Sequence, residues 1–303
     1  MPEFKIRHYD PENDLIRLSK MLTEIETIDR DGEDTSEEYL RSMKDWTGFD
    51  PQQNVWVAEL DGQFVGYGHV IPRADNPSSL YVVVHPSARR QGLGNQLLVL
   101  ALSRLEHTQS KNILVYANGR NVASNIFLKQ CGFEIAGTSG VMVAPIGDLP
   151  LAELPVGFSL RRFLKLGDLQ IVAQALNDCY KDMIGHHQNV TNADRFIKYY
   201  GEDGIHLLYD EHEILIGICV AKPEGKTDER GVSDLLDAPG LIKKYRHSGI
   251  QRALTLAVMA WLRTIGMRPI TLEYWGDDEP TIESYRSIGF ELVNQQITYQ
   301  KIL

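Results

Sequence analysis

The residues best suited to chemistry lie in a glycine-containing turn that occurs twice in the chain. The first copy reads Arg89-Arg90-Gln91-Gly92-Leu93-Gly94, and the second reads Arg246-His247-Ser248-Gly249-Ile250-Gln251. A Gly-Phe pair follows each turn, with Gly132 placed 43 residues after Arg89 and Gly289 placed 43 residues after Arg246. The same spacing on both landmarks indicates two copies of one structural unit.

The first turn has the features of a phosphate-binding site. An apolar strand is predicted at 80–84 before it, and leucines at helical spacing follow it from 94 to 106. Glycines let successive backbone amides converge, and the start of a helix adds partial positive charge. The simpler interpretation is a tight turn whose glycines serve packing. A dinucleotide site is disfavoured, because the turn is not Gly-x-Gly-x-x-Gly and no acidic residue follows at the required distance.

The sequence around the first turn resembles the GNAT superfamily of acyl-CoA-dependent N-acyltransferases. The resemblance rests on the apolar strand, Val84-His85-Pro86, the turn, an amphipathic helix, Asn121, and a short helix that ends at Gly132-Phe133. It covers residues 54–135 well and 205–292 more loosely. It implies two tandem GNAT folds of the α/β class, each a mixed sheet flanked by helices, and the two-repeat arrangement resembles that of mycothiol synthase.

The resemblance also implies a cofactor and its contacts. Acetyl-CoA would be the co-substrate, with no metal; the turn amides would hold its pyrophosphate, and the preceding strand would pair with its pantetheine arm. The residues so implied are Val82, Val84, Arg89, Arg90, Gln91, Gly92, Leu93, Gly94, Asn95 and Asn121, with Arg246 and Gly249 in the second copy.

The second turn is the weaker copy. Gln251 replaces its second glycine, and under the same offset Pro239 falls where Val82 stands, although proline has no amide to donate. A shift of one or two residues in the strand register would change that match. The second turn is therefore either another coenzyme site or a retained turn that binds nothing.

Acyl transfer also needs a proton for the departing thiolate. Many GNAT enzymes place a tyrosine four residues before the glycine of the Gly-Phe pair, which is Leu128 in the first copy and Tyr285 in the second. Leucine cannot donate a proton, so we predict Tyr285 as the catalytic acid, against the simpler interpretation of an aromatic residue packed on the sheet. The better turn and the better acid lie in different copies, and the sequence leaves open which copy is active.

Other segments are candidates for substrate binding. The acidic stretch 24–34 would either attract an ammonium substrate or form a solvated loop. One of His186 and His187 could act as a general base near neutral pH. Trp275 would either line a substrate pocket or pack at a domain interface.

The order of elements predicts two domains. We expect an N-terminal GNAT domain at 1–144, a linker at 145–157 that is rich in proline and glycine, and a C-terminal GNAT domain at 158–303. Each half reads as a strand, helices, a hairpin, a strand, the turn, a helix, a strand, a helix and a final strand.

Composition narrows the class of partner. A net charge of -10 argues against binding to nucleic acid or to anionic membranes. The three cysteines, widely spaced among apolar neighbours, suggest free thiols in a reducing compartment. The N-terminus lacks a signal-peptide core and no apolar run is long enough to span a bilayer, so we expect a cytoplasmic protein, as a monomer or a homodimer.

The sequence therefore predicts an acetyl-CoA-dependent N-acetyltransferase that acts on a small-molecule amine. We expect direct attack of the amine on the thioester, because no cysteine occupies a position that suggests a covalent acyl-enzyme. The alternatives are a non-catalytic acyl-CoA sensor and a scaffold built from two degenerate GNAT folds.

Overall fold

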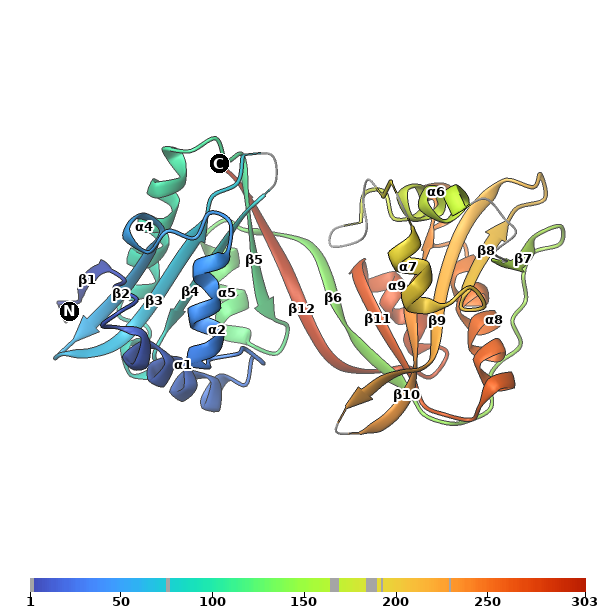
Figure 1. Cartoon of the computed structure of the whole chain (residues 1–303), viewed down its shortest axis with the longest axis horizontal. Helices are drawn as coiled ribbons and strands as arrows, with labels where there is room; N and C mark the ends of the chain where they lie inside the picture. The colour runs from blue at the N-terminus through green and yellow to red at the C-terminus, as the bar shows by residue number, and fades with distance from the viewer. Residues whose placement is uncertain (1–2, 75–76, 164–168, 184–189, 192, 229) are drawn as a thin grey trace. The chain divides into compact units, whose positions relative to one another are not determined.

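The computed structural model describes residues 3–74, 77–163, 169–183, 190–191, 193–228 and 230–303 (Figure 1). The chain forms two compact units, the first made of Met1–Ile135 and Thr298–Leu303 and the second of Ala136–Ile297. The predicted domains are continuous along the chain, whereas each compact unit includes a segment that the prediction assigns to the other domain. Residues 136–144 belong to the second unit, and the last six residues of the chain belong to the first.

The sheet of the first unit has its strands in chain order, closed by the end of the last strand. The order is β1 (Lys5–His8), β2 (Val55–Leu60), β3 (Gln63–Ile71), β4 (Ser78–Val84), β5 (Asn112–Asn118) and the final residues of β12 (Glu291–Ile302). The pairs from β1 to β4 are antiparallel, and β4 pairs with β5 in parallel. The helices are α1 (Leu15–Asp29), α2 (Glu37–Ser42), α3 (Pro51–Asn54), α4 (Leu93–Glu106) and α5 (Val122–Gln130).

Helices cover both faces of this sheet. Leu18 and Ile25 of α1 join Val55 and Val57 of β2 in one buried cluster. On α4 the buried residues recur at helical spacing, which makes one face of the helix apolar. That face lies so close to β3 that a Cβ at Gly66 would come within 3.1 Å of Leu97.

The second unit repeats this arrangement with one more strand. Its order is β12, β6 (Glu134–Ala144), β11 (Ile270–Asp277), β10 (Gly231–Leu241), β9 (Leu215–Asp228), β8 (Ile205–Tyr209) and β7 (Ser159–Arg162). The helices are α6 (Leu169–Cys179), α7 (Asp194–Tyr200), α8 (Ile250–Ile265) and α9 (Glu279–Arg286). β6, which follows the first repeat in sequence, pairs along β11 from Ile270–Ala144 to Asp277–Thr138.

The two central parallel strands separate in each unit, and this opening lies beside the glycine turn. In the first unit β4 pairs with β5 only at Ser78–Ile113 and Ser79–Leu114. In the second, β10 pairs with β11 from Asp234–Ile270 to Asp237–Glu273. Beyond these positions the strand that leads into the turn has no parallel neighbour among the residues that the structure describes.

The repeat contains one extra residue in β10. Ile270 follows Ile113 by 157 residues, but their partners Asp234 and Ser78 are 156 residues apart. A β-bulge between Asp237 and Gly240 adds the extra residue, so that the two repeats are again 157 residues apart at the turns. Pro239 lies inside this bulge, so the simple match of Pro239 with Val82 does not hold.

Candidate functional site

The two glycine turns have the same backbone. Gly92 has φ 87° and Gly249 has φ 81°, a left-handed conformation in which glycine avoids the strain of a Cβ. The preceding positions, Arg90 and His247, also have positive φ, at 62° and 61°. α4 and α8 begin directly after these glycines.

The amides of the first turn are available to a ligand. Among the described residues, none accepts a hydrogen bond from the backbone N–H groups of residues 90–95, and the first helical bond runs from Gln96 N to Gly92 O. Such amides at a helix N-terminus suit a phosphate group. The second turn has the same pattern, with its first helical bond from Ala253 N to Gly249 O.

The matching arginines bind protein groups instead. Arg89 Nε donates to Val84 O at 2.9 Å, and its two terminal nitrogens donate to the Asp29 carboxylate at 2.9 and 2.5 Å. Arg246 Nε donates to Leu241 O at 3.0 Å, and its Nη2 donates to Cys179 O. These guanidinium groups hold each turn against the end of its strand, and the predicted part of Arg89 and Arg246 in coenzyme binding stays a prediction.

The other residues of the predicted coenzyme site lie together in the first unit. Val82 and Val84 are half-buried on the stretch of β4 that pairs with β3 but not with β5, and Gly94 is half-buried in the first turn of α4. Asn121 caps α5 by accepting from Ser124 N at 3.1 Å, and its Nδ2 donates to Asp31 Oδ2 at 2.9 Å. The amide side chain of Asn121 is thus held between the helix start and the acidic segment.

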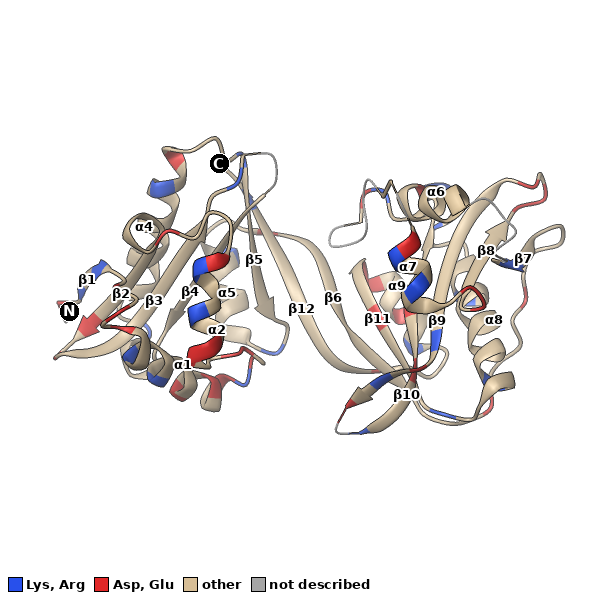
Figure 2. Ribbon diagram, viewed as in Figure 1, with Lys and Arg blue, Asp and Glu red and all other residues tan. Residues whose placement is uncertain are grey.

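The acidic stretch borders this site. Acidic residues predominate along the end of α1 and the connection after it (Figure 2). The segment is anchored by Asp29 on Arg89 and by Asp31 on Asn121. Burial raises the pKa of the Asp31 carboxyl against the opposing hydrogen bond from Asn121, and Asp31 Oδ1 is buried with no hydrogen-bond partner in the described chain.

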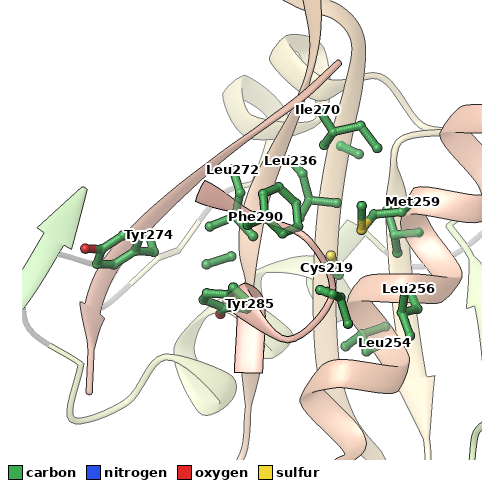
Figure 3. Packing of buried hydrophobic residues seen from close by; sticks show 14 of the residues in the cluster. Cys219, Leu236, Leu254, Leu256, Met259, Ile270, Leu272, Tyr274, Tyr285 and Phe290 are labelled. Carbon is green, nitrogen blue, oxygen red and sulfur yellow. The ribbon is translucent and has the colours of Figure 1, made fainter. Parts of the chain in front are cut away.

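Tyr285, the predicted acid, lies in the apolar core of the second unit. Its side chain is 0% exposed and packs beside Phe290 (Figure 3). The hydroxyl accepts from Gln251 Nε2 at 2.8 Å and donates to Asp277 Oδ1 at 3.1 Å. This setting does not suit a proton donor that must reach a coenzyme sulfur, and the role of Tyr285 as the acid remains a prediction opposed by its burial.

The sequence interpretation missed two buried carboxyl groups of the second unit, Asp277 beside Tyr285 and Asp237 beside Tyr200. Burial raises the pKa of Asp237 to about 8, with Glu273 and Asp277 adding to the shift. Burial also raises the pKa of Asp277 to about 7. Asp237 corresponds to Tyr81 once the bulge in β10 is taken into account. The bulge hides this match from a gap-free comparison of the repeats.

The remaining residues that the sequence singled out add no polar contact to the site of the first turn as described above. His186 and His187 fall outside the described residues. Trp275 is 43% exposed on β11, and Leu128 is buried in α5. No group of three or more His, Cys, Asp or Glu residues that could hold a metal ion occurs among the described residues. Nor does the described part of the chain contain a helix long and apolar enough to cross a membrane.

Comparison with known proteins identifies the class. Residues 51–135, which include the first turn, match the family described as "Acetyltransferase (GNAT) domain". The chain thus contains an acetyltransferase domain of the GNAT type. It is 26% identical over 257 residues to the mycothiol acetyltransferase of Saccharomonospora viridis, covering 78% of this chain and 79% of that relative. The mycothiol acetyltransferase of Rhodococcus jostii is also 26% identical, over 263 residues, 81% of this chain and 82% of that relative.

Solved structures confirm the predicted fold of the acetyltransferase. A GCN5-related N-acetyltransferase from Sphaerobacter thermophilus has a TM-score of 0.60 at 20% identity, with 99% of this chain and 95% of that chain covered. A tandem GNAT protein from the clavulanic acid biosynthesis pathway has a TM-score of 0.52 at 15% identity, with 99% and 98% covered. The predicted resemblance to tandem GNAT proteins is therefore confirmed.

Proposed function

We propose that this acetyltransferase transfers an acetyl group from acetyl-CoA to a small-molecule amine, with the coenzyme bound in the first unit. One observation carries the proposal. The N–H groups of residues 90–95 have no acceptor among the described residues, and they lie where β4 leaves β5 and leads into α4. A row of such amides beside an open strand edge can bind a pyrophosphate and an extended amide-containing arm together.

Each part of the coenzyme then has a proposed partner. The amides of residues 90–95 would bind the pyrophosphate, while the backbone of Val82 and Val84 would pair with the pantetheine arm. Asn121 would help to position the reacting end through its contact with Asp31. Arg89 would act indirectly, by holding the turn on the end of β4.

The acidic segment gives the proposed acceptor its charge. An ammonium group would be attracted to Asp31 and its acidic neighbours, and a carboxylate with a raised pKa can take up the proton that the amine must lose before attack. The amine would then attack the thioester directly. Leu128 offers no proton, so the leaving thiolate of the first unit would be protonated by water.

The buried Leu128 also favours a second candidate function, an acyl-CoA sensor without turnover. Release of free thiol from acetyl-CoA, measured with a panel of small amines that includes the acceptor of mycothiol acetyltransferases, separates the two. Turnover with any amine supports the enzyme. Coenzyme binding without turnover on the whole panel would favour the sensor.

A matched pair of variants tests the proposed coenzyme site. We expect Gly92→Val to abolish acetyl-CoA binding, because a β-branched residue cannot adopt the left-handed conformation of the turn without strain. Gly62→Val introduces the same kind of strain at φ 77° in the β2–β3 hairpin and should leave binding intact. Failure of the unaltered protein to bind acetyl-CoA at millimolar concentration would refute the proposed function.

A further inference from the structure

The second unit keeps the backbone of the coenzyme turn but differs in the side chains around it. Its turn has the same φ angles and the same unpaired amides as the first. We infer that Gln251 fills the coenzyme path of the second unit, so that each chain binds one acyl-CoA, in the first unit only. This inference rests on the proposed function.

Gln251 stands at the position of Gly94 and closes the opening between helix and strand. Its side chain is 8% exposed, although it lies in the first turn of α8. Its Nε2 donates to Pro239 O at 3.3 Å and to the Tyr285 hydroxyl at 2.8 Å. The side chain thereby spans from the helix start to the bulge in β10, which is the route that a pantetheine arm would follow beside the separated strand.

A second side chain occupies the same bulge. Tyr180, 1% exposed, donates from its hydroxyl to Ala238 O at 2.7 Å. Its ring lies so close to Gly240 that a Cβ there would meet ring atoms at 2.7 Å. The carbonyl groups of Ala238 and Pro239 therefore both bind side chains of the protein itself, whereas Val82 of the first unit remains half-exposed.

The charge beside the turn also differs between the units. Asp278 caps α9 by accepting from Thr281 N, as Asn121 caps α5, and it stands 157 residues after Asn121. Asp278 Oδ2 lies 3.1 Å from His247 Nε2 in the second turn. A carboxylate in contact with the second turn disfavours a pyrophosphate there. In the first unit the neutral Asn121 stands at this position, and the neighbouring carboxylates of Asp29 and Asp31 bind Arg89 and Asn121.

Isothermal titration of the full chain with acetyl-CoA tests the inference through stoichiometry. The unaltered protein should bind one equivalent. Gly94→Gln places the blocking side chain in the first unit and should weaken binding at least 100-fold. Val99→Gln is the matched control, since it places a glutamine on the same helix at a residue that is 59% exposed and lies outside the coenzyme site, and binding should stay unchanged. Thermal unfolding of each variant shows whether the fold is retained.

The reverse exchange tests the role of Gln251 directly. The double variant Gln251→Gly, Asp278→Asn should gain a second, weaker equivalent of acetyl-CoA. Two equivalents in the unaltered protein, or one equivalent that survives Gly94→Gln, would place the coenzyme in the second unit and overturn the inference. No second equivalent in the folded double variant would overturn the assignment of Gln251 as the block. Absence of all binding would instead refute the proposed function.

Discussion

Removing the Tyr285 hydroxyl should cost stability and leave the chemistry unchanged. In Tyr285→Phe the ring still fills its place in the core, but the bonds to Gln251 at 2.8 Å and to Asp277 at 3.1 Å are lost. Each bond contributes about 0.5–1.5 kcal/mol, and a buried polar group left without a partner costs about 1–3 kcal/mol. Gln251 keeps its bond to Pro239, whereas Asp277 Oδ2 already lacks a partner among the described residues. We therefore expect a loss of about 2–3 kcal/mol.

The size of this loss should depend on pH. Burial raises the pKa of Asp277 to about 7, and the hydrogen bond from Tyr285 lowers it. The bond therefore favours the ionised carboxylate, so its removal should cost more at pH 8 than at pH 6. Urea unfolding at the two pH values measures the difference. Tyr274→Phe is the matched control, because Tyr274 is equally buried and its hydroxyl accepts one bond, from Gln295 at 3.2 Å (Figure 3).

Thiol release per folded molecule provides the second measurement. Tyr285→Phe should match the unaltered protein, since a hydroxyl with 0% exposure does not meet the coenzyme sulfur. A 100-fold fall in turnover with stability unchanged would refute this reasoning. That result would make Tyr285 the acid and would place the active site in the second unit.

Three further changes test other parts of the structure. The pKa of Asp237 is raised from 3.8 to about 8, so the native state keeps a proton that the unfolded chain has lost, and stability falls as pH rises toward 8. Burial lowers the pKa of His69 and of His206 from 6.5 to about 4, so these two residues reduce stability only as pH falls below 6.5. Urea unfolding of Asp237→Asn between pH 6.5 and 8 should show a shallower fall, by up to about 1.4 kcal/mol per pH unit. Tyr299→Phe removes a 2.9 Å bond to Asn125 Oδ1 and should cost about 1 kcal/mol, and no change in unfolding would show that this bond contributes nothing. Leu128→Ala should cost about 2–4 kcal/mol through the cavity it leaves, with turnover per folded molecule unchanged in the thiol assay.

Local pattern was enough to predict the elements around the site. The short helix predicted to end at Gly132 is α5, and the helical pattern at 94–106 differs from α4 by one residue. Both helices have apolar residues at helical spacing. Glycine marks one boundary of each, since α4 begins after Gly92 and α5 ends shortly before Gly132. Gly92 also has the positive φ that a glycine in such a turn requires. These features depend on neighbours in sequence, which a single chain displays directly.

Features that depend on distant neighbours were not visible in the sequence. The pairing of Arg89 with Asp29 joins residues 60 positions apart, and the sequence alone does not show that an arginine present in both turns binds protein groups. The extra residue in β10 shifts Asp237 into the place of Tyr81 without changing the spacing of the turns. The sequence shows that Gln251 replaces the second glycine of the turn. It does not show that the glutamine side chain reaches Pro239, because this contact depends on the bulge in β10.

The path of β12 has a consequence for how the protein is made. Thr298–Leu303 belongs to the first unit, where Tyr299 is buried and Leu303 N donates to Lys111 O. During synthesis the first unit therefore waits for the last residues of the chain before β5 gains its outer neighbour. Until then an open strand edge remains available for wrong pairing. Synthesis of the second repeat, and not only of the first, must therefore precede the closing of the first unit's sheet.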